Sequence, residues 1–121
     1  MTVEDVIAEY SAAWSETDAA ARLAMLARTV VEGVPYCDPG AEVTGLEALS
    51  DVIAGVQAQF PGAVLLRTSE VDRHHDRIRF AWRFVDPAGE PLLDGIDVCT
   101  VADDGRLASF TVFFGPLVDA G

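Results

Sequence analysis

A single carboxylate stands among apolar residues near the end of the chain. Asp97 lies in the run Gly95-Ile-Asp-Val-Cys99, whose composition is typical of a β-strand. A carboxylate in such a run is costly to bury unless it has a partner or a chemical role. Apolar surroundings raise the pKa of a carboxyl group, which suits a residue that exchanges protons near neutral pH. We therefore interpret Asp97 as a candidate general acid or base. The alternative is a structural carboxylate held by a backbone N–H or by Thr111.

Two further candidates, Tyr36 and Asp38, lie two residues apart in a short strand expected over residues 34–38. Alternate residues of a strand share one side, so both side chains are predicted to point the same way. The phenol of Tyr36 is suited to donate a hydrogen bond to a developing oxyanion. Its alternative role is that of a core aromatic with its hydroxyl at the rim. Asp38 precedes Pro39-Gly40, and its alternative role is that of a turn residue.

The only two histidines, His74 and His75, raise the question of a metal site, because Asp72 and Asp76 flank them. Adjacent side chains on a turn diverge, so the two imidazoles are not expected to bind one ion. We therefore predict an exposed turn and no metal.

Composition and charge narrow the class of protein. A chain of 121 residues predicts one domain over 1–121. Its net charge of −12 repels phosphate backbones and anionic lipid, so neither nucleic acid nor membrane is expected as a partner. No apolar run is long enough for a membrane span, and acidic residues near the start argue against a signal peptide. Two unpaired cysteines suit a reducing compartment. We expect a soluble cytoplasmic protein.

The spacing of apolar residues predicts three helices and five strands. The first helix begins at a capping box of Thr2 and Asp5, and the second follows Thr17-Asp18. The third follows a capping box of Thr44 and Glu47 and ends at Phe60. Besides the strand over 34–38, alternating residues predict strands over 64–72, 77–85, 92–102 and 107–114. Because short turns join these strands, we predict an α+β domain whose helices cover one face of a single antiparallel sheet.

The pairing of these strands determines which residues face Asp97. A symmetric turn at His74-His75 places Glu70 opposite Arg79 and Asp72 opposite Arg77. If the next turn pairs Val85 with Glu90, three inner-face pairs follow: Trp82 with Leu93, Phe80 with Gly95, and Ile78 with Asp97. The last turn leaves either Thr111 or Val112 opposite Asp97.

This register predicts a pocket wall on the inner face of the sheet. Arg67 is expected opposite Trp82, where it either pairs with Asp97 and lowers its pKa or stacks on the indole. The predicted wall consists of Tyr10, Trp14, Arg67, Ile78, Phe80, Trp82, Leu93 and Thr111.

The composition of the outer face of the sheet predicts that two copies of the chain associate. Three arginines alternate there with apolar residues, and the neighbouring strands add more apolar side chains than a water-facing surface usually carries. We expect a homodimer through this face, which consists of Leu66, Arg77, Arg79, Ala81, Arg83, Val85, Ile96 and Val98.

The order of these elements and motifs resembles the SnoaL-like branch of the nuclear transport factor 2-like superfamily. The resemblance covers nearly the whole chain and rests on Tyr36-x-Asp-Pro39, Phe60-Pro-Gly62, Arg79-Phe-x-Trp-Arg83, Asp86-Pro-x-Gly89, Gly95-x-Asp97 and Asp104-Gly-Arg106. It implies a cone-shaped, strongly curved antiparallel sheet wrapped around the helices, with an enclosed pocket and dimerisation through the outer face. It also implies that a histidine of the His74-His75 hairpin reaches the pocket rim.

The superfamily includes ketosteroid isomerases, polyketide cyclases and dehydratases, and fold alone does not choose among them. We therefore keep two hypotheses. The first is an enzyme without cofactor, of isomerase, cyclase, hydratase or dehydratase type, that acts on a mostly apolar or polycyclic small molecule. Its catalytic residues would be Asp97, Tyr36 and Asp38. The second is a binding or dimerisation module that holds a ligand without changing it. A phosphate-binding loop, a nucleophile elbow and an HExxH motif are absent from the sequence.

Overall fold

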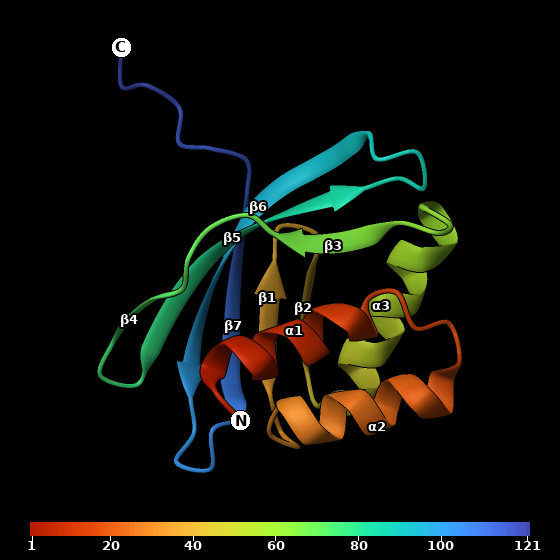
Figure 1. Ribbon diagram of the computed structural model, residues 1–121, viewed down its shortest axis with the longest axis vertical. Helices are drawn as coiled ribbons and strands as arrows, with labels where there is room; N and C mark the ends of the chain where they lie inside the picture. The colour runs from red at the N-terminus through yellow and green to blue at the C-terminus, as the bar shows by residue number, and fades with distance from the viewer.

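The computed structural model describes residues 1–121 as three helices packed on one side of a curved sheet (Figure 1). The α+β class and the cone-like curvature are as predicted. The helices are α1 (Val3–Ala13), α2 (Ala19–Thr29) and α3 (Leu46–Gln59). The strands are β1 (Pro35–Asp38), β2 (Ala41–Thr44), β3 (Val64–Arg67), β4 (Asp72–His74), β5 (Arg77–Val85), β6 (Pro91–Val101) and β7 (Leu107–Phe114).

The helix starts follow the capping rules in two of three cases. At α1 the Thr2 hydroxyl accepts the Asp5 N–H at 3.1 Å, and Asp5 accepts the Thr2 N–H at 3.0 Å, which confirms the capping box. Asp18 caps α2. The capping box predicted for α3 is wrong. Gly45 is the N-cap of that helix, with φ of 100°, and it offers no side-chain cap because Thr44 belongs to β2.

The sheet contains one strand and one parallel pairing that the sequence did not predict. The strand order is β2-β1-β7-β6-β5-β3, with β4 also paired to β5. Pro39-Gly40 is the turn of a β1–β2 hairpin and not the end of a lone strand. β1 runs parallel to β7, with Tyr36 beside Phe110, so the sheet is not entirely antiparallel. No short turn joins β1 to β7, and so none fixes their direction.

The registers of the central strands differ from the prediction by two residues. The strand predicted over 64–72 is divided into β3, which keeps the predicted register, and β4, which does not, because Asp72 lies opposite Arg79. The turn is displaced because His75 adopts φ of 54°. On the other side of β5, Phe80 lies opposite Asp97 and Trp82 opposite Gly95, after an irregularity between Phe84 and Val85. A shift of two residues preserves the face of every side chain, so Asp97 still points inward.

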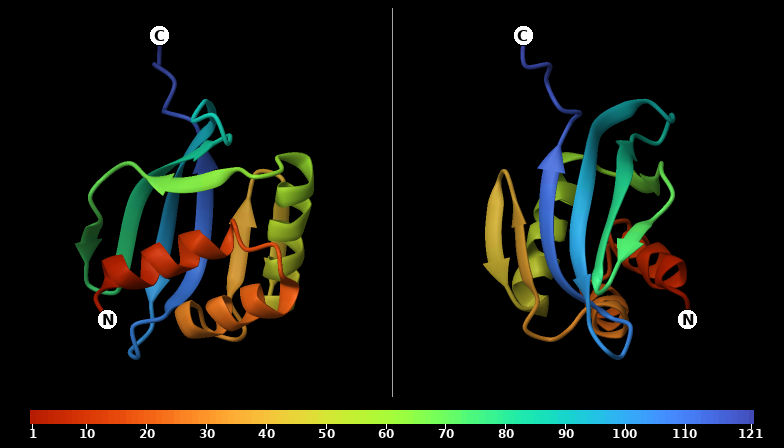
Figure 2. Two further views of the ribbon diagram at one scale, coloured as in Figure 1. Left: turned by 45° about the vertical axis from the view of Figure 1, so that its right-hand side comes forward. Right: turned by 90° about the vertical axis from the view of Figure 1, so that its left-hand side faces the viewer.

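The concave face of the sheet and the helices enclose one hydrophobic core. Figure 2 shows β5, β6 and β7 curving around the helices, while the chain after Gly115 leads away from the body. Tyr10 of α1 stacks on Phe110 of β7, with ring centroids 4.6 Å apart. None of the three helices has the length and apolar character that a membrane crossing would require.

A buried arginine fixes the ends of the helices that border the site. Arg22 of α2 is only 4% exposed, and its guanidinium donates to Ser50 Oγ at 2.8 Å and to the Glu16 carbonyl at 2.8 Å. It also reaches Gln57 of α3, whose amide in turn donates to the Trp14 carbonyl at 2.9 Å. This network holds the C-terminal end of α1, and with it Trp14, against α3. A buried charge needs such a set of partners to offset its desolvation.

Candidate functional site

A cavity of about 480 Å³ lies between the concave face of the sheet and the helices. This volume falls within the range of small-molecule sites. Fourteen of its nineteen lining residues are hydrophobic, and they include both tryptophans and both tyrosines of the chain. The lining residues are Tyr10, Trp14, Tyr36, Asp38, Gly40, Ala41, Val52, Gly55, Val56, Gln59, Phe60, Leu65, Trp82, Phe84, Leu92, Leu93, Asp97, Val112 and Phe114.

Asp97 is the buried carboxylate of this cavity. It is 4% exposed, and its Oδ1 accepts a hydrogen bond from Trp82 Nε1 at 2.8 Å. Burial raises the pKa of Asp97 to about 7, against a smaller lowering by the Trp82 hydrogen bond, and the charge of Asp38 adds to the rise. The hydrogen bond occupies one carboxylate oxygen and leaves the other for a ligand. At neutral pH both protonation states of Asp97 are therefore populated, as proton exchange requires.

The position of Trp82, the partner of Asp97, depends on a glycine in β6, the strand that carries Asp97. Trp82 lies opposite Gly95, two residues before Asp97. A Cβ at Gly95 would lie 2.6 Å from Cε2 and 2.7 Å from Cη2 of the indole, and closer still to Cζ2. The missing side chain thus gives the indole room to lie against β6 with its N–H at Asp97. Phe84 and Phe114 each pack edge-on against the same ring, at interplanar angles of 90° and 87°.

Tyr36 and Asp38 form a hydrogen-bonded pair in the part of the wall that β1 contributes. The Tyr36 hydroxyl donates to Asp38 Oδ2 at 2.7 Å, and Asp38 Oδ1 accepts the Gly40 N–H at 2.7 Å. Burial, and then the hydrogen bond to Asp38, raises the pKa of Tyr36, so its hydroxyl stays protonated. Its hydrogen is directed to Asp38 rather than to the cavity. Asp38 is therefore both a turn residue and a lining residue.

Tyr10 and Trp14 extend the polar part of the wall from α1. Tyr10 is 1% exposed, and burial raises its pKa well above the ordinary value, with a further rise from the charge of Asp97. The Trp14 Nε1–H lies near enough to the Tyr10 hydroxyl to oppose this rise, yet it is buried without a completed hydrogen bond. Tyr10 is thus a neutral hydroxyl close to the carboxylate of Asp97.

Seven of the predicted site residues line one cavity, which brings together segments from α1, β1, β5 and β6. They are Tyr10, Trp14, Tyr36, Asp38, Trp82, Leu93 and Asp97. Four predicted lining residues do not reach it. Because of the shifted register, Ile78 and Phe80 pack in the hydrophobic core instead. Thr111 is on the exposed outer face, since Val112 lies opposite Asp97.

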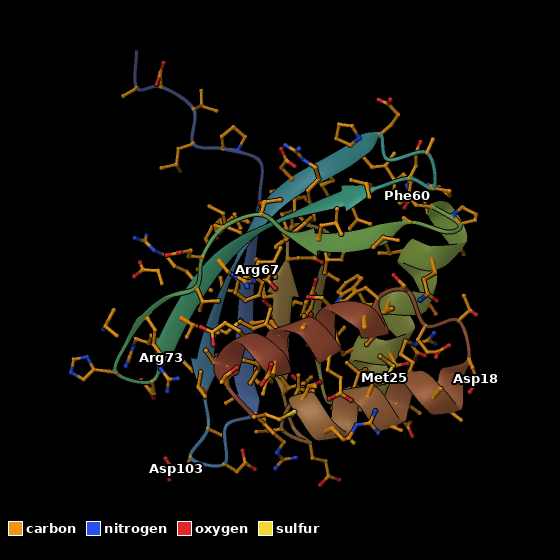
Figure 3. All side chains as sticks on the ribbon, in the orientation of Figure 1. Asp18, Met25, Phe60, Arg67, Arg73 and Asp103 are labelled. Atoms are coloured by element: carbon orange, nitrogen blue, oxygen red, sulfur yellow. The ribbon has the colours of Figure 1, made fainter.

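Arg67 does not pair with Asp97, nor does it line the cavity. It lies opposite Trp82 as predicted, but its guanidinium donates to the Ser69 carbonyl at 2.6 Å and is exposed (Figure 3). Of the two alternatives for Arg67, pairing with Asp97 and the lowering of its pKa are therefore wrong.

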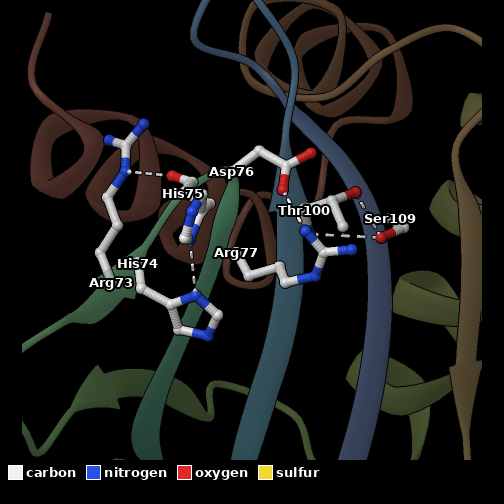
Figure 4. Close-up of polar contacts among 7 residues, drawn as sticks. All are labelled: Arg73, His74, His75, Asp76, Arg77, Thr100 and Ser109. Atoms are coloured by element: carbon white, nitrogen blue, oxygen red, sulfur yellow. Dashed lines mark hydrogen bonds and ion pairs between the residues drawn. The ribbon is translucent and has the colours of Figure 1, made fainter.

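The two histidines lie far from the cavity. Arg73 marks their hairpin in Figure 3, at the opposite end of the molecule from Phe60, a lining residue at the end of α3. The rings do not diverge as predicted, because the positive φ of His75 brings the two Nδ1 atoms to 3.2 Å (Figure 4). Neither histidine reaches the pocket rim, and no group of three or more potential ligands is arranged to hold a metal ion.

Two groups of apolar residues stand out among the parts of the wall that the sequence did not predict. One is the face of α3, with Val52, Val56 and Phe60, whose helical spacing marked it as apolar but not as pocket-lining. The other lies at the adjoining ends of β5, β6 and β7, where Phe84, Leu92 and Phe114 close the wall. Phe84 shares the inner face with Trp82, so strand alternation already indicated its direction.

Comparison with known proteins assigns the chain to a family. The family described as the SnoaL-like domain matches residues 7–110, which contain most of the cavity wall and Asp97. The chain belongs to this family. No curated protein sequence matches it.

Solved structures show the same fold over almost the whole SnoaL-like domain. One is a protein from Agrobacterium tumefaciens, provisionally named an isomerase of the SnoaL-like family, with 27% identity and a TM-score of 0.85 over 93% of this chain and 96% of that one. A provisionally named SnoaL-like polyketide cyclase from a Jannaschia species has 19% identity and a TM-score of 0.71, covering 93% and 83% of the two chains. A nuclear transport factor 2-like protein from Cytophaga hutchinsonii has 13% identity and a TM-score of 0.69, covering 96% and 92%.

Proposed function

We propose that this SnoaL-like domain is an acid/base enzyme that needs no cofactor and moves a proton on a mostly apolar small molecule. The observation that carries the proposal is Asp97, a carboxyl group with a pKa of about 7 in the wall of a cavity of about 480 Å³. A group whose pKa lies near the working pH is suited both to accept and to donate a proton. The relative from Agrobacterium provisionally named an isomerase supports the same class of reaction.

The arrangement supports a proton shift within one substrate. The Asp97 carboxylate takes a proton from a substrate carbon next to a carbonyl group, and the electron pair of the broken C–H bond moves toward the carbonyl oxygen. The neutral hydroxyl of Tyr10, near Asp97, is suited to donate to that oxygen. Asp97 then returns the proton to another carbon. The product has the same atoms as the substrate, with one proton and one double bond moved, so the reaction described is an isomerisation.

The test is exchange of hydrogen for deuterium in heavy water. Small ketones, both neutral and amine-bearing, are incubated with the protein, and NMR follows the loss of the proton next to the carbonyl. We expect exchange that rises with pH through about 7, because the ionised form of Asp97 is the base. Absence of exchange above the buffer rate for the whole panel would count against the proposal.

A binding module without chemistry is the second candidate, and one observation favours it. The hydroxyl hydrogen of Tyr36 is engaged by Asp38, so this pair does not supply a free donor to a ligand in the cavity. A protein with only this function would bind the same ketones without any exchange.

We also propose that two copies associate through the outer face of the sheet. Leu66, Val98 and Phe113 are 46%, 37% and 59% exposed there. Arg79 and Arg83 pair with Asp72 and Asp94 on the same face, which leaves it nearly neutral within a chain of charge −12. Two copies therefore meet here with little repulsion and remove apolar surface from water.

Light scattering on a sizing column is expected to give twice the chain mass of 12.9 kDa at micromolar concentration. Phe113→Glu should convert the dimer to a monomer, because it buries a charge in the interface. Val118→Glu is the matched control, since this residue is 93% exposed in the C-terminal segment. A monomer mass for the unmodified protein would refute the proposed assembly.

A further inference from the structure

The cavity wall carries negative charge and no positive charge. Asp97 and Asp38 are its two ionisable acids, and none of the nineteen lining residues is arginine, lysine or histidine. The chain has eight basic residues, yet all of them lie elsewhere. An anionic ligand would thus meet two carboxylates without a counter-charge.

The same wall concentrates the electron-rich rings of the protein. Both tryptophans, both tyrosines, Phe60, Phe84 and Phe114 line it. Trp14 meets Phe84 at 78°, and Trp82 meets Phe84 at 90°, so neighbouring rings stand nearly perpendicular to each other. The face of an aromatic ring is its negative side and attracts cations, most strongly in tryptophan.

Asp97 gives this wall a specific point of attachment. Its side chain is buried, one oxygen bonds the Trp82 indole, and no basic residue forms an ion pair with it. A buried carboxylate without a counter-charge is costly, and a bound cation would offset that cost.

We propose that the natural ligand carries an alkylammonium group, bound beside Asp97, on an otherwise apolar body. This inference rests on the proposed function only in placing the ligand in the same cavity. The aromatic rings contact the alkyl groups around the nitrogen, as in aromatic cages for quaternary ammonium ions. The ionised carboxylate of Asp97 attracts the ammonium group, and a neutral molecule of the same shape lacks this attraction.

The charge of Asp97 makes this selectivity depend on pH. Four other titratable groups influence Asp97 or are influenced by it, and three of them stay neutral because their pKa values are raised. The neutral groups are Tyr10, Tyr36 and Cys99, and the fourth group is Asp38. Near pH 7, Asp97 is thus the group whose ionisation changes the affinity for an ammonium ligand. The bound ligand should in turn lower the pKa of Asp97.

The experiment compares three molecules of one shape: choline, the neutral 3,3-dimethylbutan-1-ol and the anionic 3,3-dimethylbutanoate. We expect choline to bind at least about tenfold more tightly than the alcohol at pH 8, and the carboxylate to bind most weakly. The preference for choline should decline as the pH falls below 7. Carbon-13 NMR of the Asp97 carboxyl group should show its pKa falling when choline is bound.

Two variants separate the local charge from the overall charge. Asp97→Asn should remove most of the preference for choline without weakening the alcohol. Asp119→Asn removes the same charge from the exposed C-terminal segment and should leave the preference intact. Equal binding of choline and the alcohol at pH 8, or an unchanged Asp97 pKa with choline bound, would overturn the inference. Choline has no proton next to a carbonyl, so this result is independent of whether the ketones undergo exchange.

Discussion

Replacing Asp97 by Asn is expected to lower the rate of deuterium exchange about 100-fold or more while the protein stays folded. The amide keeps the shape of the side chain and an oxygen that accepts the Trp82 N–H, but it cannot take up a proton at neutral pH. The loss should appear in kcat and kcat/KM together, because the proton transfer occurs only in the transition state. An exchange rate within threefold of the unmodified protein would exclude Asp97 as the base.

The stability of the same variant reports on the pKa of Asp97. The pKa of Asp97 is about 7 in the folded state and 3.8 for an ordinary Asp. Between these two pH values, Asp97 is therefore protonated in the folded state and ionised in the unfolded state. Raising the pH through this range therefore destabilises the unmodified protein, by an amount on the order of 4 kcal/mol at pH 8. The amide side chain of the variant does not titrate, so its stability lacks this dependence. We expect Asp97→Asn to melt higher than the unmodified protein at pH 8, with the gap closing toward pH 4. A lower melting temperature at pH 8 would indicate a structural anion.

The direction of Asp97 was predictable from the sequence, but its partner was not. Strand alternation fixes the face of a residue, and that prediction survived a register error of two residues. The error came from the β5–β6 turn, where the pairing is irregular between Phe84 and Val85. The sequence predicts Arg67 or Thr111 as the partner, whereas the Trp82 indole donates to Asp97. Arg67 keeps its predicted place opposite Trp82, but its guanidinium donates to the Ser69 carbonyl, which no local pattern indicates.

The helices and their stripes were predicted better than the edges of the sheet. The Thr2 and Asp5 cap is local, and local chemistry was sufficient to identify it. β2 and the β1–β7 pairing depend on contacts between distant segments, which no local pattern reports. Arg22 was missed for the same reason. An arginine in an alanine-rich helix is usually exposed, and its burial depends on Ser50, Gln57 and the Glu16 carbonyl, which other segments supply.

A methyl group at Gly95 is expected to have the largest effect on the site of any single small substitution. Its carbon would lie 2.6 Å from Cε2 and 2.7 Å from Cη2 of Trp82, shorter than real contacts of a Cβ. The ring has little room to retreat, since Phe84 and Phe114 pack edge-on against it. Overpacking of this kind typically costs about 1 to 3 kcal/mol. Movement of the indole would also break its hydrogen bond with Asp97.

Gly95→Ala should therefore unfold at a lower temperature and raise the pKa of Asp97, because the Trp82 hydrogen bond that lowers this pKa is lost. The pH at which deuterium exchange is half-maximal should rise with it, a change that a purely structural defect would not produce. Gly33→Ala is the control, since a Cβ there meets nothing within 4 Å. Adding Trp82→Phe to Gly95→Ala should relieve the clash and recover part of the stability, while leaving the pKa of Asp97 high. If Gly95→Ala melts like the unmodified protein and keeps the same exchange midpoint, the indole is not held in place by the space at Gly95.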